Sequence, residues 1–223
     1  MEAAHGDGRA RRPAGAILDF GGVMTEPVFR MDRGVDSELA RLVVFFLREA
    51  SAVYADTEAE HDIHLLETGR MSDSEFFTRL CERYEQAGNP RIEPETARQA
   101  VIGRGISASA AMVDAVRHLR RAGVRTALLT NNAREWGPAW RPVLPLDELF
   151  DVVVDSSEVG MRKPDPAIYL LTCRRLGLRP EDCLFVDDLE CNVAAAAALG
   201  METILCDDPI RAAAAVRDRI DAA

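Results

Sequence analysis

Five short apolar segments alternate with longer amphipathic segments over most of the chain. Short apolar runs of this kind predict buried strands of a parallel sheet, and they lie at 14–20, 124–130, 152–155, 183–187 and 202–206. Helical periodicity runs through 108–122, 166–176, 189–199 and 209–220. Because strand alternates with helix, the pattern predicts an α/β fold with a Rossmann-like parallel sheet and helices on both of its faces.

The segment between the first two predicted strands breaks this alternation. It contains only helical patterns, at 36–54, 58–68, 72–87 and 94–104, and the third begins with Ser72 and Glu75 at the spacing of a capping box. We therefore predict an all-helical cap over residues 26–105, inserted into an α/β core of residues 14–25 and 106–223. Residues 1–13 lack periodicity and are predicted to form a flexible tail.

Polar side chains with catalytic potential fall where the predicted strands end. They are Asp19 after the first strand, Thr130, Asn131 and Asn132 after the second, Lys163 beyond the third, and Asp187 and Asp188 after the fourth. The carboxyl ends of parallel strands meet at one crevice, where such sheets bind ligands. An aspartate nucleophile, a lysine, a hydroxyl and a carboxylate pair for a divalent metal together indicate phosphoryl transfer through an aspartyl-phosphate.

The composition draws attention to one of these positions and narrows the function. Of the 27 basic residues, 26 are arginine and only Lys163 is lysine. The net charge of −10 argues against broad binding to nucleic acid or anionic membranes, and no apolar run approaches the roughly 20 residues that span a bilayer. Five cysteines without a C-x-x-C pair, and no recognisable secretory signal, predict a reduced cytoplasmic protein.

Four motifs occur along the chain in a fixed order. They are Leu18-Asp19-Phe20-Gly21-Gly22-Val23, Leu128-Leu129-Thr130-Asn131-Asn132, Gly160-Met161-Arg162-Lys163-Pro164 and Phe185-Val186-Asp187-Asp188-Leu189-Glu190-Cys191-Asn192. Together they resemble the haloacid dehalogenase-like (HAD-like) superfamily of aspartate-nucleophile hydrolases, over roughly residues 14–206. Within it, the chain is most similar to the subgroup that contains the phosphatase domain of soluble epoxide hydrolase.

The resemblance implies a Mg²⁺-dependent phosphatase acting on a small phosphorylated metabolite. It makes Asp19 the nucleophile and Lys163 the cation that steadies it. The groups that bind phosphate would be Thr130, Asn131 and Gly22. The resemblance also implies the Mg²⁺ ligands: Asp19, the Gly21 carbonyl and Asp188, which with Asn192 matches the family's D-x-x-x-[DN] spacing, and Asp187 as a second ligand or a neighbour of the direct ligands.

The chain departs from the family pattern at one position. Most members carry a second aspartate, the general acid and base, two residues after the nucleophile, where this chain has Gly21. General acid–base catalysis typically contributes about 10²- to 10⁴-fold in rate. A water or a cap side chain would have to serve instead, and Glu26 and Asp32 are near in sequence.

Two other functions fit parts of the pattern. A metal-independent 2-haloacid dehalogenase also lacks the second aspartate, although such enzymes generally lack the paired carboxylates seen at Asp187 and Asp188. A phosphate-binding or regulatory protein would keep the site without turnover. Elsewhere, His61 and His64 are interpreted as a solvated helix face and Trp136 and Trp140 as a packed one. The sequence leaves the oligomeric state open.

Overall fold

The computed structural model describes residues 12–26, 38–54, 56, 59–103 and 105–221. Its centre is a five-stranded sheet with the order β3-β2-β1-β4-β5, in which every neighbouring pair is parallel. The strands are β1 (Gly15–Leu18), β2 (Arg125–Thr130), β3 (Val152–Asp155), β4 (Cys183–Asp187) and β5 (Glu202–Leu205). Each falls within or very near a predicted strand, which confirms the parallel Rossmann-like sheet.

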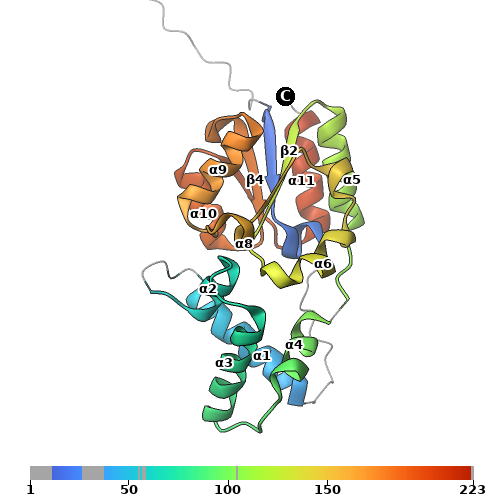
Figure 1. The fold of residues 1–223 in the computed structure, drawn as a ribbon. Helices are drawn as coiled ribbons and strands as arrows, with labels where there is room; N and C mark the ends of the chain where they lie inside the picture. Colours follow the sequence, from blue (N-terminus) through green and yellow to red (C-terminus); the bar gives the residue numbers. More distant parts are fainter. Residues whose placement is uncertain (1–11, 27–37, 55, 57–58, 104, 222–223) are drawn as a thin grey trace, which may run out of the picture.

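Helices pack on both faces of this sheet (Figure 1). On one face, α5 (Ala110–Arg121) and α11 (Pro209–Asp221) cover Ala16 and Leu18 of β1. On the other, α9 (Pro166–Leu176) and α10 (Glu190–Ala198) cover Ile17. Successive side chains of a strand point to opposite faces. All four β1 residues are therefore buried, which explains the unbroken apolar run in the sequence.

The connection between β2 and β3 contains short elements that the periodicity did not predict. They are α6 (Gly137–Trp140) and α7 (Leu146–Leu149), with 3₁₀ turns at Arg134–Trp136 and Arg141–Val143. A further one-turn helix, α8 (Ser156–Val159), follows β3, and a 3₁₀ turn at Pro180–Asp182 precedes β4. Prolines at or near the starts of α6, α7 and the 3₁₀ turns at Arg141–Val143 and Pro180–Asp182 favour a first helical turn there.

Four of the helices between β1 and β2, those that precede α5, form a unit that we call the helical insertion. They are α1 (Glu38–Val53), α2 (Asp62–Glu67), α3 (Asp73–Gln86) and α4 (Pro94–Ile102). The insertion has its own apolar cluster, which includes Leu42, Phe77 and Leu80. The Ser72 side chain accepts a hydrogen bond from the Glu75 backbone at the start of α3, as the capping spacing predicts.

The insertion faces the edge of the sheet at which β1 ends (Figure 1). Thr25 and Ala108 form an antiparallel bridge, so the chain leaves the α/β unit and returns to it at adjacent points. Most of the predicted tail, 1–13, and part of the predicted cap, 27–37, lie outside the described residues. No helix among the described residues is long and apolar enough to cross a membrane, and the five cysteines are free thiols.

The fold predicts that two leucine truncations lower the free energy of unfolding by different amounts. Leu128 of β2 is fully buried in the sheet core, whereas Leu170 on α9 is 36% exposed. Leu128→Ala should lower the free energy of unfolding by about 2–5 kcal/mol because it leaves a cavity. Leu170→Ala should change it by less than about 0.5 kcal/mol. Urea denaturation of both variants measures this difference, and equal losses would contradict the sheet packing.

Candidate active site

The single lysine of the chain bridges two carboxylates at the carboxyl ends of the central strands. The Lys163 Nζ atom lies 2.5 Å from Asp19 Oδ1 and 2.7 Å from Asp187 Oδ2. Asp19 follows β1 and Asp187 ends β4, its neighbour in the sheet. Lys163 arrives from the loop before α9 and is 1% exposed. The structure thus brings together three residues that the sequence placed 24 to 168 positions apart.

The carboxylate of Asp187 is held by three donors. Its Oδ1 atom accepts hydrogen bonds from the Leu189 backbone N–H and from Asn192 Nδ2, each at 2.9 Å, while Oδ2 accepts from Lys163. Asp187 has no solvent exposure. The residue therefore fixes Lys163 and the start of α10 in one position.

Burial shifts the acidity of these groups. It raises the pKa of Asp19 above its ordinary value, while the charge of Lys163 opposes this rise and repulsion from Asp187 and Asp188 adds to it. Burial alone would lower the pKa of Lys163, but the carboxylates of Asp187 and Asp19 hold it well above its ordinary value. Partial removal from water, together with the Asp187 charge, raises the pKa of Asp188 to about 6.

Two glycines shape the turn that follows Asp19. Gly22 has a φ of +72°, and a Cβ atom there would lie 2.4 Å from Asp188 Oδ2. Only glycine therefore fits between β1 and the Asp188 carboxylate. Gly21 has an ordinary φ of −72°, and a Cβ atom there would meet only Asp19 Oδ2, at 3.9 Å. The Gly22 N–H donates to Thr25 Oγ1 at 3.1 Å, so this donor already has a partner.

The residues after β2 serve different purposes. Thr130 is buried and lines the crevice. The Asn131 side chain accepts from the Lys163 N–H and donates to the Lys163 carbonyl, both at 2.9 Å. This pair of hydrogen bonds clamps the peptide that carries the lysine. Asn132 also lines the cavity, and its backbone N–H donates to Ser156 Oγ while its side-chain oxygen accepts from the Ala133 N–H.

A polar cluster joins the helical insertion to the core beside Asn131. Glu67 at the end of α2 accepts from Arg162 Nε at 2.7 Å, and its backbone carbonyl accepts from Ser156 Oγ at 2.6 Å. Arg162 lies over the ring of Tyr54, with Cζ 4.6 Å from the centroid. Asn131 Nδ2 donates to the Tyr54 hydroxyl at 2.8 Å. The sequence reasoning missed Tyr54, Glu67 and Arg162 as parts of the site.

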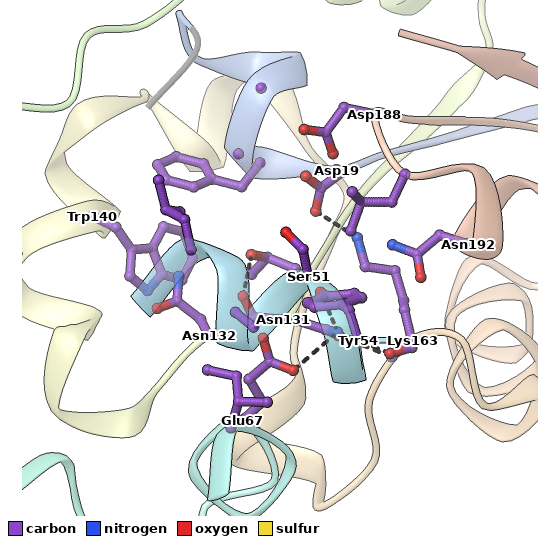
Figure 2. Close-up of a pocket in the computed structure, with 18 of the residues that line it drawn as sticks. Asp19, Ser51, Tyr54, Glu67, Asn131, Asn132, Trp140, Lys163, Asp188 and Asn192 are labelled. Atoms are coloured by element: carbon purple, nitrogen blue, oxygen red, sulfur yellow. Dashed lines mark hydrogen bonds and ion pairs between the residues drawn. The ribbon is translucent and has the colours of Figure 1, made fainter. Parts of the chain in front are cut away.

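A cavity of about 920 Å³ opens between the insertion and the sheet edge. Asp19, Lys163 and Asp188 line its floor (Figure 2), and Thr130 also lines the cavity. The insertion supplies apolar side chains such as Phe46, Leu47 and Val101, and the β2–β3 connection supplies Trp136 and Trp140. A charged floor under a largely apolar wall suits a ligand with an anionic head and a less polar body.

The floor of the cavity has the donor chemistry of a divalent-cation site. Asp19 and Asp188 line the floor, and the buried Asp187 pairs with Lys163, so three carboxylates surround one ammonium. Mg²⁺ binds through one or two carboxylates and retains several waters, so Asp19 and Asp188 are sufficient. Among the described residues, no group of three or more His, Cys, Asp and Glu side chains is arranged to hold an ion by itself.

The histidine pair in the insertion has a structural role. His61 Nε2 pairs with Asp56 at 2.9 Å, and the buried His64 Nε2 donates to the Val53 carbonyl at 2.9 Å. The interpretation of this pair as a solvated face is therefore wrong for His64. Trp140 is buried against Phe20, with ring centroids 5.0 Å apart, so the interpretation of a packed tryptophan is correct there.

Comparison with known proteins identifies the family of this arrangement. The model of the haloacid dehalogenase-like hydrolases matches residues 14–200. Acyl-CoA dehydrogenase family member 10 of Mus musculus is 44% identical over 99 residues, 44% of this chain and 9% of that protein. Bifunctional epoxide hydrolase 2 of Sus scrofa is 27% identical over 203 residues, 86% of this chain and 36% of that protein. The chain thus spans well under half the length of either relative.

Other relatives carry the names of phosphatases. They are phosphoglycolate phosphatase 1 of Pseudomonas aeruginosa, hexitol phosphatase A of Escherichia coli and the bifunctional riboflavin kinase/FMN phosphatase of Arabidopsis thaliana.

Solved structures share the fold at low sequence identity. A HAD family enzyme of Bacteroides thetaiotaomicron, in complex with magnesium and inorganic phosphate, has a TM-score of 0.60 at 21% identity and covers 86% of this chain and 92% of its own. The L-2-haloacid dehalogenase of Xanthobacter autotrophicus has a TM-score of 0.60 at 20% identity, covering 86% and 76%.

Removal of the buried ammonium should destabilise the protein. Lys163→Met leaves the carboxylates of Asp19 and Asp187 without their counter-ion, which typically costs about 3–5 kcal/mol. Urea denaturation at neutral pH measures the loss. The control is Arg70→Met, since Arg70 pairs with Glu60 on the exposed surface and should leave the midpoint unchanged. A Lys163→Met protein as stable as the wild type would contradict the bridging role.

Proposed function

Because the chain belongs to the haloacid dehalogenase-like hydrolase family, we propose that it is a phosphatase that hydrolyses a small phosphate monoester through an aspartyl-phosphate on Asp19. The observation that carries this proposal is the buried Asp19, held by Lys163 next to Asp188 at the floor of the cavity. The phosphatase names of several relatives support the reaction class.

Asp19 supplies the attacking atom in the proposed mechanism. One of its carboxylate oxygens attacks phosphorus, the bond from phosphorus to the ester oxygen breaks, and the leaving alcohol takes up a proton. Water then attacks the aspartyl-phosphate, the bond from phosphorus to the Asp19 oxygen breaks, and inorganic phosphate leaves. Lys163 contacts Asp19 throughout and stabilises the negative charge on the transferred group.

The remaining residues of the floor bind the phosphoryl oxygens. Thr130 offers its hydroxyl. Asn131 offers its backbone N–H, since its side-chain amide is occupied by the Lys163 peptide. Gly22 leaves the space beside Asp188 open, because a side chain there would collide with the Asp188 carboxylate. The backbone can therefore approach the ligand closely at this turn.

Two of the three carboxylates fit a Mg²⁺ cofactor. Asp19, Asp188 and the Gly21 carbonyl would hold it, while Asp187 acts through Lys163 because both of its oxygens already accept hydrogen bonds. The bound ion would supply positive charge that keeps the nucleophile and the phosphate together. A related fold that contains magnesium and phosphate supports this choice of metal.

The helical insertion is proposed to be a cap that selects the substrate. Its predicted bounds, 26–105, begin just after Thr25 and end shortly before Ala108, the two residues that bridge the junction. Phe46, Leu47 and Val101 present apolar surface to the cavity. Phosphate esters of aryl or other partly apolar alcohols should therefore bind more tightly than those of sugars.

The test of this function is hydrolysis of 4-nitrophenyl phosphate with and without Mg²⁺. Turnover should require Mg²⁺ and cease in EDTA. Asp188→Ala should lower both turnover, by roughly 10²-fold or more, and the affinity for Mg²⁺ measured by isothermal titration calorimetry. The matched control is Asp218→Ala, an exposed aspartate of α11, which should leave both quantities unchanged.

The alternatives give different results in the same assay. A dehalogenase would release halide from a 2-haloacid in EDTA and leave phosphate esters intact. A phosphate-binding protein would bind phosphate with Mg²⁺ but turn over neither compound. Full activity on 4-nitrophenyl phosphate in EDTA would contradict the proposed role of Mg²⁺.

A further inference from the structure

The turn after the nucleophile carries no proton donor for the leaving group. Gly21 has no side chain, and among the described residues, its chain neighbours aside, only Asp19 Oδ2 lies within 4 Å of its Cβ position. Of the two acidic residues near in sequence, Glu26 is not among the residues that line the cavity, and Asp32 lies outside the described residues. Lys163 is already engaged by two carboxylates.

The helical insertion brings a tyrosine hydroxyl into the same cavity. Tyr54 directly follows α1 and lines the cavity with Asp19 and Lys163 (Figure 2). Displacement at phosphorus is in line, so the leaving oxygen lies on the far side of phosphorus from Asp19. The insertion faces this edge of the sheet (Figure 1). Tyr54 therefore belongs to the wall that the leaving group faces.

The hydrogen bonds around Asn131 determine whether the Tyr54 hydroxyl acts there as a donor or as an acceptor. The Lys163 N–H donates to Asn131 Oδ1, so the amide nitrogen must face the other side. That nitrogen donates to the Tyr54 oxygen at 2.8 Å. Among the contacts of the described residues, the Tyr54 hydroxyl accepts this hydrogen bond and donates none. Its own hydrogen is thus available to a ligand in the cavity.

Tyr54 keeps its proton at rest, and its neighbours include groups that would stabilise the deprotonated form. Burial and the negative charge of Glu67 raise its pKa well above the ordinary value, so the resting group carries its proton. Arg162 lies over the ring, and Asn131 donates to the oxygen. Both contacts would stabilise the phenolate that forms when the proton leaves.

We propose that Tyr54 is the general acid of this site, in place of the aspartate that Gly21 lacks; the proposal rests on the phosphatase function above. As the bond from phosphorus to the ester oxygen breaks, the Tyr54 hydroxyl donates its proton to that oxygen, and the neutral alcohol leaves. The phenolate then removes a proton from the water that attacks the aspartyl-phosphate. Each turnover therefore returns Tyr54 to its protonated form.

This role makes the effect of Tyr54 depend on the leaving group. An alkyl alcohol is a weaker acid than a phenol, so its alkoxide gains from protonation, whereas 4-nitrophenolate leaves without help. Tyr54→Phe should lower kcat/KM for alkyl phosphates by about 10²- to 10⁴-fold. It should change kcat/KM for 4-nitrophenyl phosphate only a few-fold. A plot of log kcat/KM against the pKa of the leaving alcohol, over a series of esters, measures this dependence as a slope.

Tyr84→Phe is the matched control because it makes the same change in the same helical insertion. The Tyr84 hydroxyl is buried, has no hydrogen-bond partner among the described residues and does not line the cavity. Tyr84→Phe should leave kcat/KM unchanged for every ester. Thermal melting of both variants verifies that each remains folded.

A second variant tests whether the lost function is proton donation. Gly21 has an ordinary φ and free space at its Cβ position, so Gly21→Asp introduces a carboxylic acid without backbone strain. Added to Tyr54→Phe, this substitution should restore turnover of alkyl phosphates and flatten the slope. In the wild-type background it should change the slope little, since a donor is already present.

Three results would overturn the proposal while leaving the phosphatase function intact. One is a Tyr54→Phe enzyme with the wild-type slope. Another is a loss that is equal for all esters, which would mean that Tyr54 only supports Asn131. The third is a steeper slope in Ser51→Ala instead, since Ser51 is another hydroxyl of the insertion in the cavity. A wild-type chain that hydrolyses no phosphate ester would contradict the phosphatase function itself, and this proposal with it.

Discussion

The ion bridge from Lys163 to Asp19 and Asp187 is the interaction on which the site depends. It joins the ends of β1 and β4 to the loop before α9, in a position with 1% solvent exposure for the lysine. Two buried carboxylates that contact the same ammonium would repel one another strongly if the ammonium were removed. The surrounding groups serve this bridge, since Asn131 clamps the Lys163 peptide and Asn192 fixes Asp187.

A second polar network ties the helical insertion to this bridge. Glu67 and Tyr54 come from the insertion, and Arg162 and Asn131 come from the core, next to Lys163 and Thr130. This network fixes the position of the helical insertion, which would select the substrate, relative to the cavity floor, which would perform the chemistry. Its polar contacts are buried, so they specify one orientation of the insertion rather than merely adding attraction.

The sequence predicted the sheet and most of the floor because both depend on local patterns. Buried parallel strands are short apolar runs, and their carboxyl ends meet, so Asp19, Thr130 and Asp187 had to lie close together. Tyr54 and Arg162 were missed for the opposite reason. Their partners are 77 and 95 residues distant in the chain, and only the docking of the insertion brings them together. The short helices between β2 and β3 were not predicted, because a single helical turn is too short to show a hydrophobic periodicity.

The most direct test of the central claim is to trap phosphate on Asp19. The enzyme is mixed with Mg²⁺ and a phosphate ester, quenched in acid within a single turnover, and digested for peptide mass spectrometry. The account predicts one phosphoryl group on the peptide that contains Asp19, and none in Asp19→Asn, because an amide does not attack phosphorus. Phosphate released by an active wild-type enzyme with the label on another residue, or full turnover by Asp19→Asn, would contradict it.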